Sequence, residues 1–167
     1  MADNFYTTVI QNDLRFNSPS RIDDIALPEP VLRERVSRII DDASAHGMEL
    51  MVYETYRSLE RQQELFEKGA SLLRNNGVHH FGLACDLVKN IAGEPSWKGD
   101  FSLLGVLAQA YGLIWGGDWG TPNIPHKFID EVHVQRCSVT RQATLFALNW
   151  YPDSGYDPYS QRFSSLV

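Results

Sequence analysis

The sequence has few cysteines, no long apolar run and no excess of positive charge. Its 167 residues include two cysteines, Cys85 and Cys137, which form neither a disulfide framework nor the closely spaced pair typical of a metal site. No run approaches the roughly eighteen apolar residues of a membrane-spanning helix. The first residues lack the basic and apolar regions of a secretory signal. We therefore expect synthesis in a reducing cytoplasm, with both thiols free and no membrane insertion.

The charge balance argues against a nucleic-acid partner. The net charge is −6 at pH 7 and the pI is near 5.3, whereas a nucleic-acid-binding surface usually carries a basic patch. Hydrophobic residues make up 43% of the chain and charged residues 22%, as in ordinary soluble globular proteins. The length predicts a single domain over residues 1–167, with a core over 28–148 and irregular segments at both ends. We expect this domain to be a monomer.

Hydrophobic periodicity and turn residues predict interspersed helices and strands. We predict helices over residues 28–45, 59–68 and 101–111, and strands over residues 49–55, 85–88, 113–115 and 131–135. Ser58 and Asp100 are the expected N-caps of the second and third helices. Residues 93–99 are predicted to form a loop. Elements in this mixed order are typical of an α+β fold, in which helices pack on a small, mainly antiparallel sheet.

Residues 79–86 carry two histidines and a carboxylate around Gly82. Imidazole nitrogens and carboxylate oxygens are ligands that a catalytic zinc ion prefers, with bonds about 2 Å long. Extended backbone would place the ends of this stretch roughly 23 Å apart. A shared ion therefore requires a chain reversal, and Gly82 is the expected site for it. His80 competes with His79 as the ligand, and a buried strand with an incidental Asp86 is the simpler alternative at this point.

A third candidate ligand, His133, lies in the predicted strand 131–135. Two histidines and one carboxylate form a three-ligand set that leaves the fourth zinc position open, as in catalytic sites. Hydrolysis also requires a group that accepts a proton, and both Asp130 and Glu131 precede His133 closely. Strand alternation puts Glu131 on the same face as His133 and so favours Glu131. Arg57, at a strand-to-helix junction, is a candidate for stabilising oxyanion charge.

Four short motifs follow one another between residues 48 and 135. Tyr-Arg-Ser occupies residues 56–58, Gly-Val-His-His-Phe-Gly-Leu-Ala-Cys-Asp residues 77–86, Trp-Gly-Gly-Asp-Trp residues 115–119 and Asp-Glu-Val-His residues 130–133. In this order they resemble the motifs of the zinc D-Ala-D-Ala carboxypeptidase and L-Ala-D-Glu endopeptidase superfamily (the M15 peptidases), which includes vancomycin-resistance dipeptidases and many phage endolysins. The sequence departs from the family's Ser-x-His-x-x-Gly-x-Ala-x-Asp at its first position, where glycine replaces serine. Four ordered motifs are far more specific than any one of them.

The resemblance implies a role for each candidate residue. The family's base lies three positions before the last histidine, so Asp130 takes that role in place of Glu131. Strand alternation carries no weight if these two residues lie in a turn. Arg57 corresponds to an arginine that contacts the substrate or the oxyanion. The implied zinc ligands are His79, Asp86 and His133, and the candidate substrate contacts are Trp115, Asp118 and Trp119.

The remaining histidines and the first cysteine have simpler interpretations. His79 is favoured over His80 because only that register keeps the glycine and the aspartate of the motif in place. We expect His46 and His126 to be surface or packing residues. Cys85 is adjacent to a predicted ligand but should face the opposite side of its strand and be a small core residue.

The resemblance also implies a hedgehog/D-Ala-D-Ala peptidase-like fold, a bound Zn2+ and a peptidoglycan stem peptide as the substrate. We expect internal cleavage at the L-Ala–D-Glu bond, because residues 115–119 resemble endopeptidase-type members. The alternatives are D-Ala-D-Ala carboxypeptidase or dipeptidase activity, and a non-catalytic, zinc-stabilised wall-binding or virion protein. Without a signal peptide, action at the cell wall requires release by another route, as for a phage endolysin, and an intracellular role in recycling is the other possibility.

Overall fold

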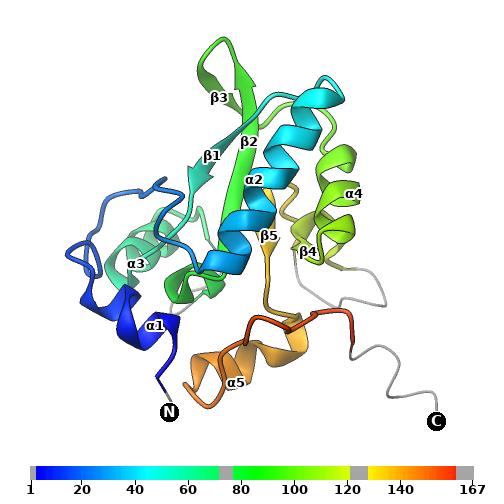
Figure 1. Cartoon of the computed structure of the whole chain (residues 1–167). Coiled ribbons are helices and arrows are strands. Elements are labelled where there is room, and N and C mark those ends of the chain that lie inside the picture. The colour runs from blue at the N-terminus through cyan, green and yellow to red at the C-terminus, as the bar shows by residue number, and fades with distance from the viewer. Residues whose placement is uncertain (1–2, 72–76, 121–127, 161–167) are drawn as a thin grey trace.

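The computed structural model describes residues 3–71, 77–120 and 128–160 and has the predicted α+β architecture (Figure 1). Within these residues the helices are α1 (Phe5–Thr8), α2 (Pro30–Ala45), α3 (Leu59–Glu67), α4 (Ser102–Ala110) and α5 (Gln142–Phe146). The strands are β1 (Leu50–Glu54), β2 (Ala84–Ile91), β3 (Glu94–Ser96), β4 (Ile114–Trp115) and β5 (His133–Gln135). Short 3-10 helices are η1 (Ile10–Asn12), η2 (Val78–Phe81), η3 (Gly116–Asp118) and η4 (Val139–Arg141).

The strands form one sheet with the order β1-β2-β5-β4, and β3 pairs with the end of β2. Every pairing is antiparallel, as predicted. In the register of the sheet, Asp86 lies opposite Glu54 on one side and opposite His133 on the other. These three residues therefore form one row across neighbouring strands, and the row underlies the candidate site.

Helices α2 and α4 lie side by side on the sheet and enclose the main hydrophobic core (Figure 1). The buried positions of α2 recur every three or four residues, at Leu32, Val36, Ile39 and Ala43. Full burial of one large aliphatic side chain contributes roughly 1.5–3 kcal/mol. Cys85 and Leu87 of β2 belong to the same core. Because side chains alternate along a strand, Asp86 points to the other face of the sheet.

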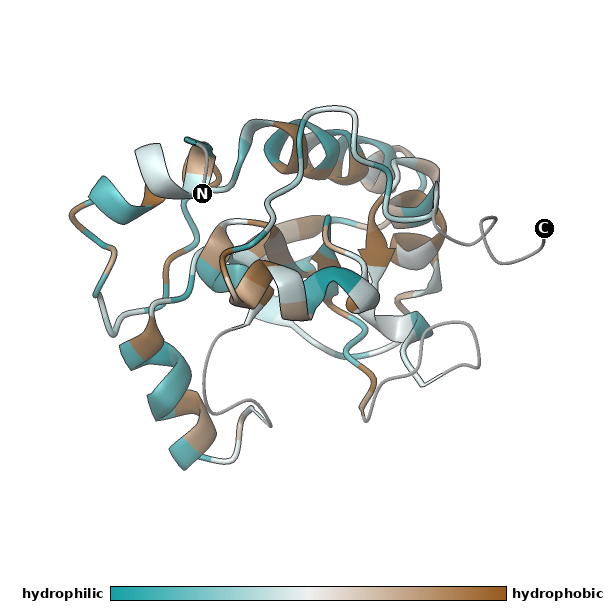
Figure 2. Cartoon of the chain, turned by 90° about the horizontal axis from the view of Figure 1, so that it is seen from below, coloured by the Kyte–Doolittle hydropathy of each residue, from teal (hydrophilic) through white to brown (hydrophobic). Residues whose placement is uncertain are grey.

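A second hydrophobic cluster joins the N-terminal segment to η2 and α5, and it includes Tyr6, Ile10 and Leu145. Figure 2 views the molecule from this end and shows hydrophobic and hydrophilic stretches interleaved along its helices. The N-terminal segment was predicted to be irregular, and this prediction is wrong at α1, a short helix that begins with a capping box. Asn4 Oδ1 accepts from the Thr7 N–H at 3.1 Å, and Thr7 Oγ1 accepts from the Asn4 N–H at 3.0 Å.

Three further details differ from the sequence predictions. The predicted loop 93–99 contains β3, where Pro95 pairs opposite Asn90. Proline is tolerated there because β3 is an edge strand whose one neighbour among the described strands is β2. Asp100 accepts from the Ser102 N–H at 2.8 Å, but it is not the N-cap that was predicted. Helix α4 begins at Ser102, so the N-cap position falls on Phe101. Helix α5 was not among the predicted elements. None of the described helices is both long and apolar enough to cross a bilayer.

Candidate metal centre

A tight chain reversal brings His79 back to Asp86. Helix η2 ends at Gly82, whose φ of 68° lies in the left-handed region that favours glycine. The N–H of this glycine donates to the His79 carbonyl at 3.1 Å. A Cβ at this position would lie 2.3 Å from Ile10 Cδ1, so a side chain would also clash. The reversal predicted at Gly82 is therefore confirmed, and β2 then places Asp86 opposite His133.

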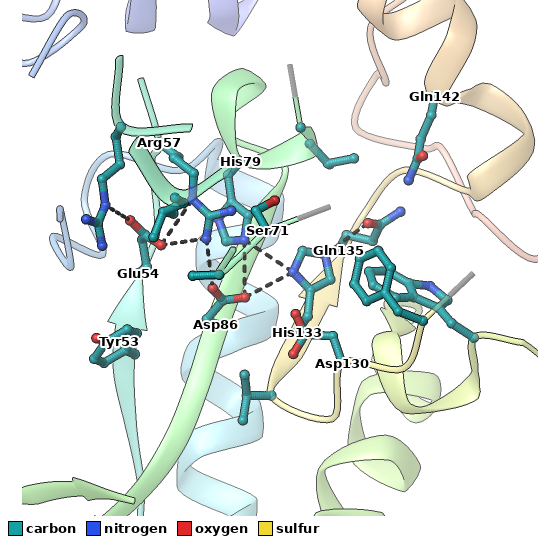
Figure 3. A pocket seen from close by; sticks show the side chains of 18 of the residues that line it. Tyr53, Glu54, Arg57, Ser71, His79, Asp86, Asp130, His133, Gln135 and Gln142 are labelled. Atoms are coloured by element: carbon teal, nitrogen blue, oxygen red, sulfur yellow. Dashed lines mark hydrogen bonds and ion pairs between the residues drawn. The ribbon is translucent and has the colours of Figure 1, made fainter. Parts of the chain in front are cut away.

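Three buried donor atoms converge on one point (Figure 3). Asp86 Oδ1 lies 3.1 Å from His79 Nε2 and 3.0 Å from His133 Nδ1, and the two nitrogens are 3.2 Å apart. The exposed fractions of the three residues are only 4–7%. In tetrahedral zinc sites, bonds of about 2.0–2.1 Å place neighbouring ligand atoms roughly 3.3 Å apart. The separations of the three donors therefore fit one shared zinc ion.

Neighbouring carbonyl oxygens orient both histidines as ligands. His79 Nδ1 lies 2.7 Å from the Thr55 carbonyl oxygen, which can only accept, so this nitrogen carries the proton. His133 Nε2 lies 2.9 Å from Gln135 Oε1, and the Gln135 amide nitrogen donates to the Cys137 carbonyl. This second bond fixes the amide so that its oxygen faces the histidine. The opposite nitrogen of each ring then presents a lone pair toward Asp86, as a metal ligand requires.

The Asp86 carboxylate is held ionised by its neighbours. Burial by itself would raise the pKa of Asp86, but this pKa lies well below its usual range because His79 and His133, when protonated in the absence of a metal ion, supply positive charge and hydrogen bonds. On the other oxygen, Arg57 Nη2 donates to Asp86 Oδ2 at 3.3 Å. Arg57 also donates to Glu54 Oε2, from Nη2 at 2.5 Å and from Nε at 3.1 Å. The guanidinium fork of Arg57 thus joins two buried acids behind the donor set.

Asp130 lines the same cleft, whereas Glu131 is exposed. Residues 131–132 form a turn, in which the His133 N–H donates to the Asp130 carbonyl at 3.2 Å. Strand alternation does not apply to this turn because β5 begins only at His133. Burial raises the pKa of the Asp130 carboxyl, and the nearby His133 offsets part of that increase. A carboxyl with a raised pKa is better suited to accept and return a proton near neutral pH.

The Trp-Gly-Gly-Asp-Trp run holds the turn that carries Asp130. The Gly116 carbonyl accepts from the Asp130 N–H at 3.0 Å, and a Cβ on Gly116 would lie 2.3 Å from the Asp130 carbonyl oxygen. Trp115 donates from Nε1 to the Glu131 carbonyl at 2.7 Å. Its indole lies against Gly117, where a Cβ would be 2.2 Å from the ring. Both glycines are therefore required by close packing around this turn.

Of the three candidate substrate contacts, Trp119 is the one that lines the cleft in the described part of the chain. Its ring centroid lies 5.0 Å from that of His133 and 5.4 Å from that of Phe128. Trp115 and Asp118 are not among the described lining residues. The contacts of Trp115 indicate a packing role, and direct substrate contacts of Trp115 and Asp118 stay predictions.

The other histidines and Cys85 lie outside the donor set. His80 is buried in the second hydrophobic cluster, where its Nε2 lies 2.9 Å from the Tyr6 hydroxyl. His46 is exposed, and Cys85 is fully buried in the main core, both as expected. His126 lies outside the described residues.

The cleft has a volume of about 470 Å³ and includes polar residues that the sequence reasoning missed. Figure 3 shows Tyr53 of β1 on one side of the donor set and Gln142 of α5 on the other. Glu54 is buried between Arg57 and Arg61 and gave no sequence signal beyond a single acid in a strand. Gln135 had a usable signal, because it lies two residues after a predicted ligand on the same strand face.

Two curated proteins are similar to this chain. The peptidoglycan L-alanyl-D-glutamate endopeptidase CwlK of Bacillus subtilis (strain 168) is 23% identical over 126 residues, which cover 62% of this chain and 75% of CwlK. The L-alanyl-D-glutamate peptidase of Listeria phage A118 is 30% identical over 102 residues, which cover 59% of this chain and 34% of that protein. The match thus spans about a third of the phage relative. No family model matches the chain.

A solved structure with a similar fold is the vancomycin resistance D,D-pentapeptidase VanY from the VanB-type cassette, crystallised as a variant in complex with Zn(II). The TM-score is 0.52 at 15% identity, and the match covers 72% of this chain and 78% of that chain. At this identity the likeness concerns the fold, and it confirms the predicted D-Ala-D-Ala peptidase-like fold. The two curated relatives confirm the resemblance to the L-Ala-D-Glu endopeptidases.

Proposed function

We propose that this protein is a zinc-dependent peptidase that hydrolyses the L-Ala–D-Glu bond of peptidoglycan stem peptides. The observation that carries the proposal is the convergence of His79, Asp86 and His133 on one point of a cleft that Asp130 also lines. The names of the two curated relatives support both the reaction and the bond. The fit of the donor separations to tetrahedral ligation supports zinc as the metal.

The chain's own residues divide the work between binding and proton transfer. His79, Asp86 and His133 would hold the zinc ion, which when bound lowers the pKa of water to about 7 and polarises the scissile carbonyl. Asp130 accepts the proton of the attacking water and returns it to the leaving amine, and its raised pKa suits both transfers.

Arg57 keeps Asp86 in place and adds positive charge beside the reacting carbonyl. Its side chain is 15% exposed and lines the cleft while it pairs with Glu54 and Asp86. In the proposed reaction this charge favours the oxyanion that develops on the carbonyl oxygen. The cleft volume is within the usual range of small-ligand pockets, so a short peptide fits it better than a long polymer.

Two other functions use the same residues in different ways. A carboxypeptidase or dipeptidase that releases terminal D-Ala would need the same metal centre, and the fold neighbour VanY is named a D,D-pentapeptidase. A non-catalytic zinc-stabilised protein would need the three ligands but not Asp130. The position of Asp130 in the cleft beside the donors therefore favours an enzyme over a binding module. We further propose that the protein acts as a monomer at the cell wall after release, as its similarity to a phage peptidase suggests.

Mass spectrometry of purified muropeptides incubated with the zinc-loaded protein tests the proposal. We expect a fragment that begins with D-Glu, and we expect none after chelation or with Asp130→Asn. Release of free D-Ala with an intact L-Ala–D-Glu bond would contradict the choice of bond. No cleavage of any stem peptide by a fully zinc-loaded protein would favour the binding module.

A further inference from the structure

We propose that Trp97, braced by Tyr53, forms a platform at one end of the cleft that binds the pyranose ring of the sugar to which the stem peptide is attached. This inference rests on the proposed cleavage of stem peptides. It adds a carbohydrate subsite to that function and accounts for a residue that neither the metal centre nor the hydrophobic core uses.

The platform is part of the cleft that contains the metal donors. Trp97 and Tyr53 both line this cleft together with His79, Asp86 and His133. Tyr53 lies on the side of the donor set away from Gln142, so the platform marks one end of the cleft (Figure 3). Trp97 is 49% exposed, whereas Trp119, at the same cleft, is only 5% exposed. The indole of Trp97 thus keeps a large apolar surface in contact with solvent.

Its neighbours hold the indole in one position. The rings of Trp97 and Tyr53 meet at 82°, with centroids 4.7 Å apart, an edge-to-face contact that restrains both rings. The Arg21 guanidinium lies 4.4 Å from the centroid of the Tyr53 ring and pairs with Asp23 at 3.2 Å. The backbone next to Trp97 is also held, because Lys89 Nζ donates to the carbonyl of residue 98 at 3.2 Å. A restrained ring loses little freedom when a ligand stacks on it.

The chemistry of an exposed indole suits a sugar ring. One face of a pyranose presents C–H groups with partial positive charge, and the face of an aromatic ring carries partial negative charge. Stacking the two removes apolar surface of both from water, while the sugar hydroxyls stay solvated at the rim. The indole N–H adds one hydrogen-bond donor.

The proposed scissile bond lies close to the sugar. In the stem peptide, L-Ala alone separates that bond from the lactyl group of the sugar, so the sugar lies within roughly two or three extended residue lengths, about 7–10 Å. Tyr53 precedes Glu54, which reaches the donor set through Arg57 by contacts of 2.5 and 3.3 Å. Cleavage next to a terminal D-Ala would move the sugar at least three residues farther away, roughly 10 Å more. A platform in the same cleft as the donors therefore suits cleavage near the sugar better than cleavage at the far end of the stem.

The test compares two substrates that share one stem peptide, with and without the muramyl sugar on L-Ala. We expect the parent to prefer the sugar-bearing substrate, and Trp97→Ala to lower kcat/KM for it about tenfold, mainly through KM, the usual range for an aromatic contact. Cleavage of the sugar-free peptide should change less than about twofold. Trp97→Phe, which keeps a ring, should retain most of the preference. Ile91→Ala is the matched control, because Ile91 is 59% exposed on the same hairpin but is not among the described residues that line the cleft.

Each outcome decides the matter. Equal losses on both substrates in Trp97→Ala would show a structural or peptide-binding role and overturn the platform. So would unchanged rates on both substrates. A parent that cleaves both substrates equally well would overturn the platform but not the proposed function. A parent that cleaves neither substrate would overturn both.

Discussion

Two adjacent histidines, His79 and His80, lie in opposite environments. His79 donates from Nδ1 to the Thr55 carbonyl, and its Nε2 faces the other two metal donors. His80 has the same tautomer, because its Nδ1 lies 3.2 Å from the Arg57 carbonyl oxygen. Its Nε2, however, accepts from the Tyr6 hydroxyl at 2.9 Å. Nε2 of His80 thus faces a hydroxyl donor, whereas Nε2 of His79 faces the point on which the candidate metal donors converge.

The surroundings of the two rings reinforce this difference. His80 lies among aromatic rings, with the Phe16 centroid at 5.4 Å and the Tyr56 centroid at 5.7 Å, and burial lowers its pKa so that it stays neutral at pH 7. His79 instead belongs to a group of three lone pairs with no proton between them, an arrangement that is stable only with a cation or added protons. A neutral histidine with both nitrogens satisfied is a packing residue. The comparison indicates that hydrogen-bond partners, and not residue type, distinguish the proposed ligand from a core residue.

The largest expected effect is a loss of catalysis without loss of zinc from the centre that contains His79. Asp130→Asn removes the proposed proton acceptor but none of the proposed metal ligands. We expect the variant to keep its zinc and to lose about 10²–10⁴-fold in kcat, the usual contribution of a positioned general base. Glu131→Gln, the matched change at the exposed neighbour, should have little effect. Steady-state kinetics with parallel zinc analysis checks both, and reversed results would make Glu131 the base.

The next effect concerns the partner that selects the tautomer of His133. Gln135→Leu removes the oxygen that accepts from His133 Nε2, so the ring is free to place its proton on the nitrogen that faces the metal. We expect metal affinity to fall about 10–100-fold. Gln135→Glu keeps an acceptor oxygen and should retain most of the affinity. Competition with a zinc chelator measures both variants, and equal affinities in all three proteins would show that Gln135 plays no part.

The convergence of His79 and Asp86 was predictable because its signals are local, whereas the groups that support the two side chains are not. The spacing of His79, Gly82 and Asp86 places ligands and a reversal within one short stretch. The partner of His79 is the backbone carbonyl of Thr55, and any residue type offers that group, so the sequence carries no trace of it. Gln135 stands two residues from a ligand and could have been found by strand alternation.

The differences in the fold have separate causes. Helix α1 is short and was passed over, although its capping box at Asn4 and Thr7 is a recognised start signal. Strand β3 has only three residues, and the middle one is Pro95. These residues form a strand because β2 extends beyond its predicted end and pairs with them. Strand alternation does not apply to Glu131, because the chain turns before β5 begins at His133. An overlooked cap, a strand pairing and an early turn thus account for the three differences.

A smaller effect is expected on the His80 side. His80→Phe keeps the aromatic packing but leaves the Tyr6 hydroxyl without its acceptor and the Arg57 carbonyl without its donor. We expect the free energy of unfolding to fall by about 1–3 kcal/mol, the cost of buried groups that lose their partners. Tyr6→Phe removes the hydroxyl that bonds to His80 and to Gln11 but leaves the Arg57 carbonyl paired, and it should cost about 1 kcal/mol. Urea denaturation of the metal-free proteins measures both changes. Values within error of the parent would show that water replaces these bonds.

The smallest effect concerns the segment that carries Phe16 over His80. Arg15 pairs with Asp13 and Asp24 at 2.8 Å each, and its hydrogen bond lowers the pKa of Asp13 to about 2. Because this folded pKa lies below the usual value of about 3.9, the stabilisation is complete above pH 4 and is lost as the pH falls toward 2. Arg15 is 39% exposed, so solvent limits the contribution to less than about 1 kcal/mol. In Arg15→Gln, NMR titration should show the pKa of Asp13 returning toward 3.9. An unchanged pKa would exclude this pair.

Calorimetric titration of the metal-free protein with zinc tests most directly whether His79, and not His80, completes the metal centre. The parent and His80→Phe should each bind one zinc ion per chain with similar affinity. His79→Ala should bind more than about 100-fold more weakly, since even groups that only orient a ligand contribute 10–100-fold. Circular dichroism would establish that both variants are folded. Parent-like zinc binding by His79→Ala, or loss of binding in a folded His80→Phe, would contradict the assignment.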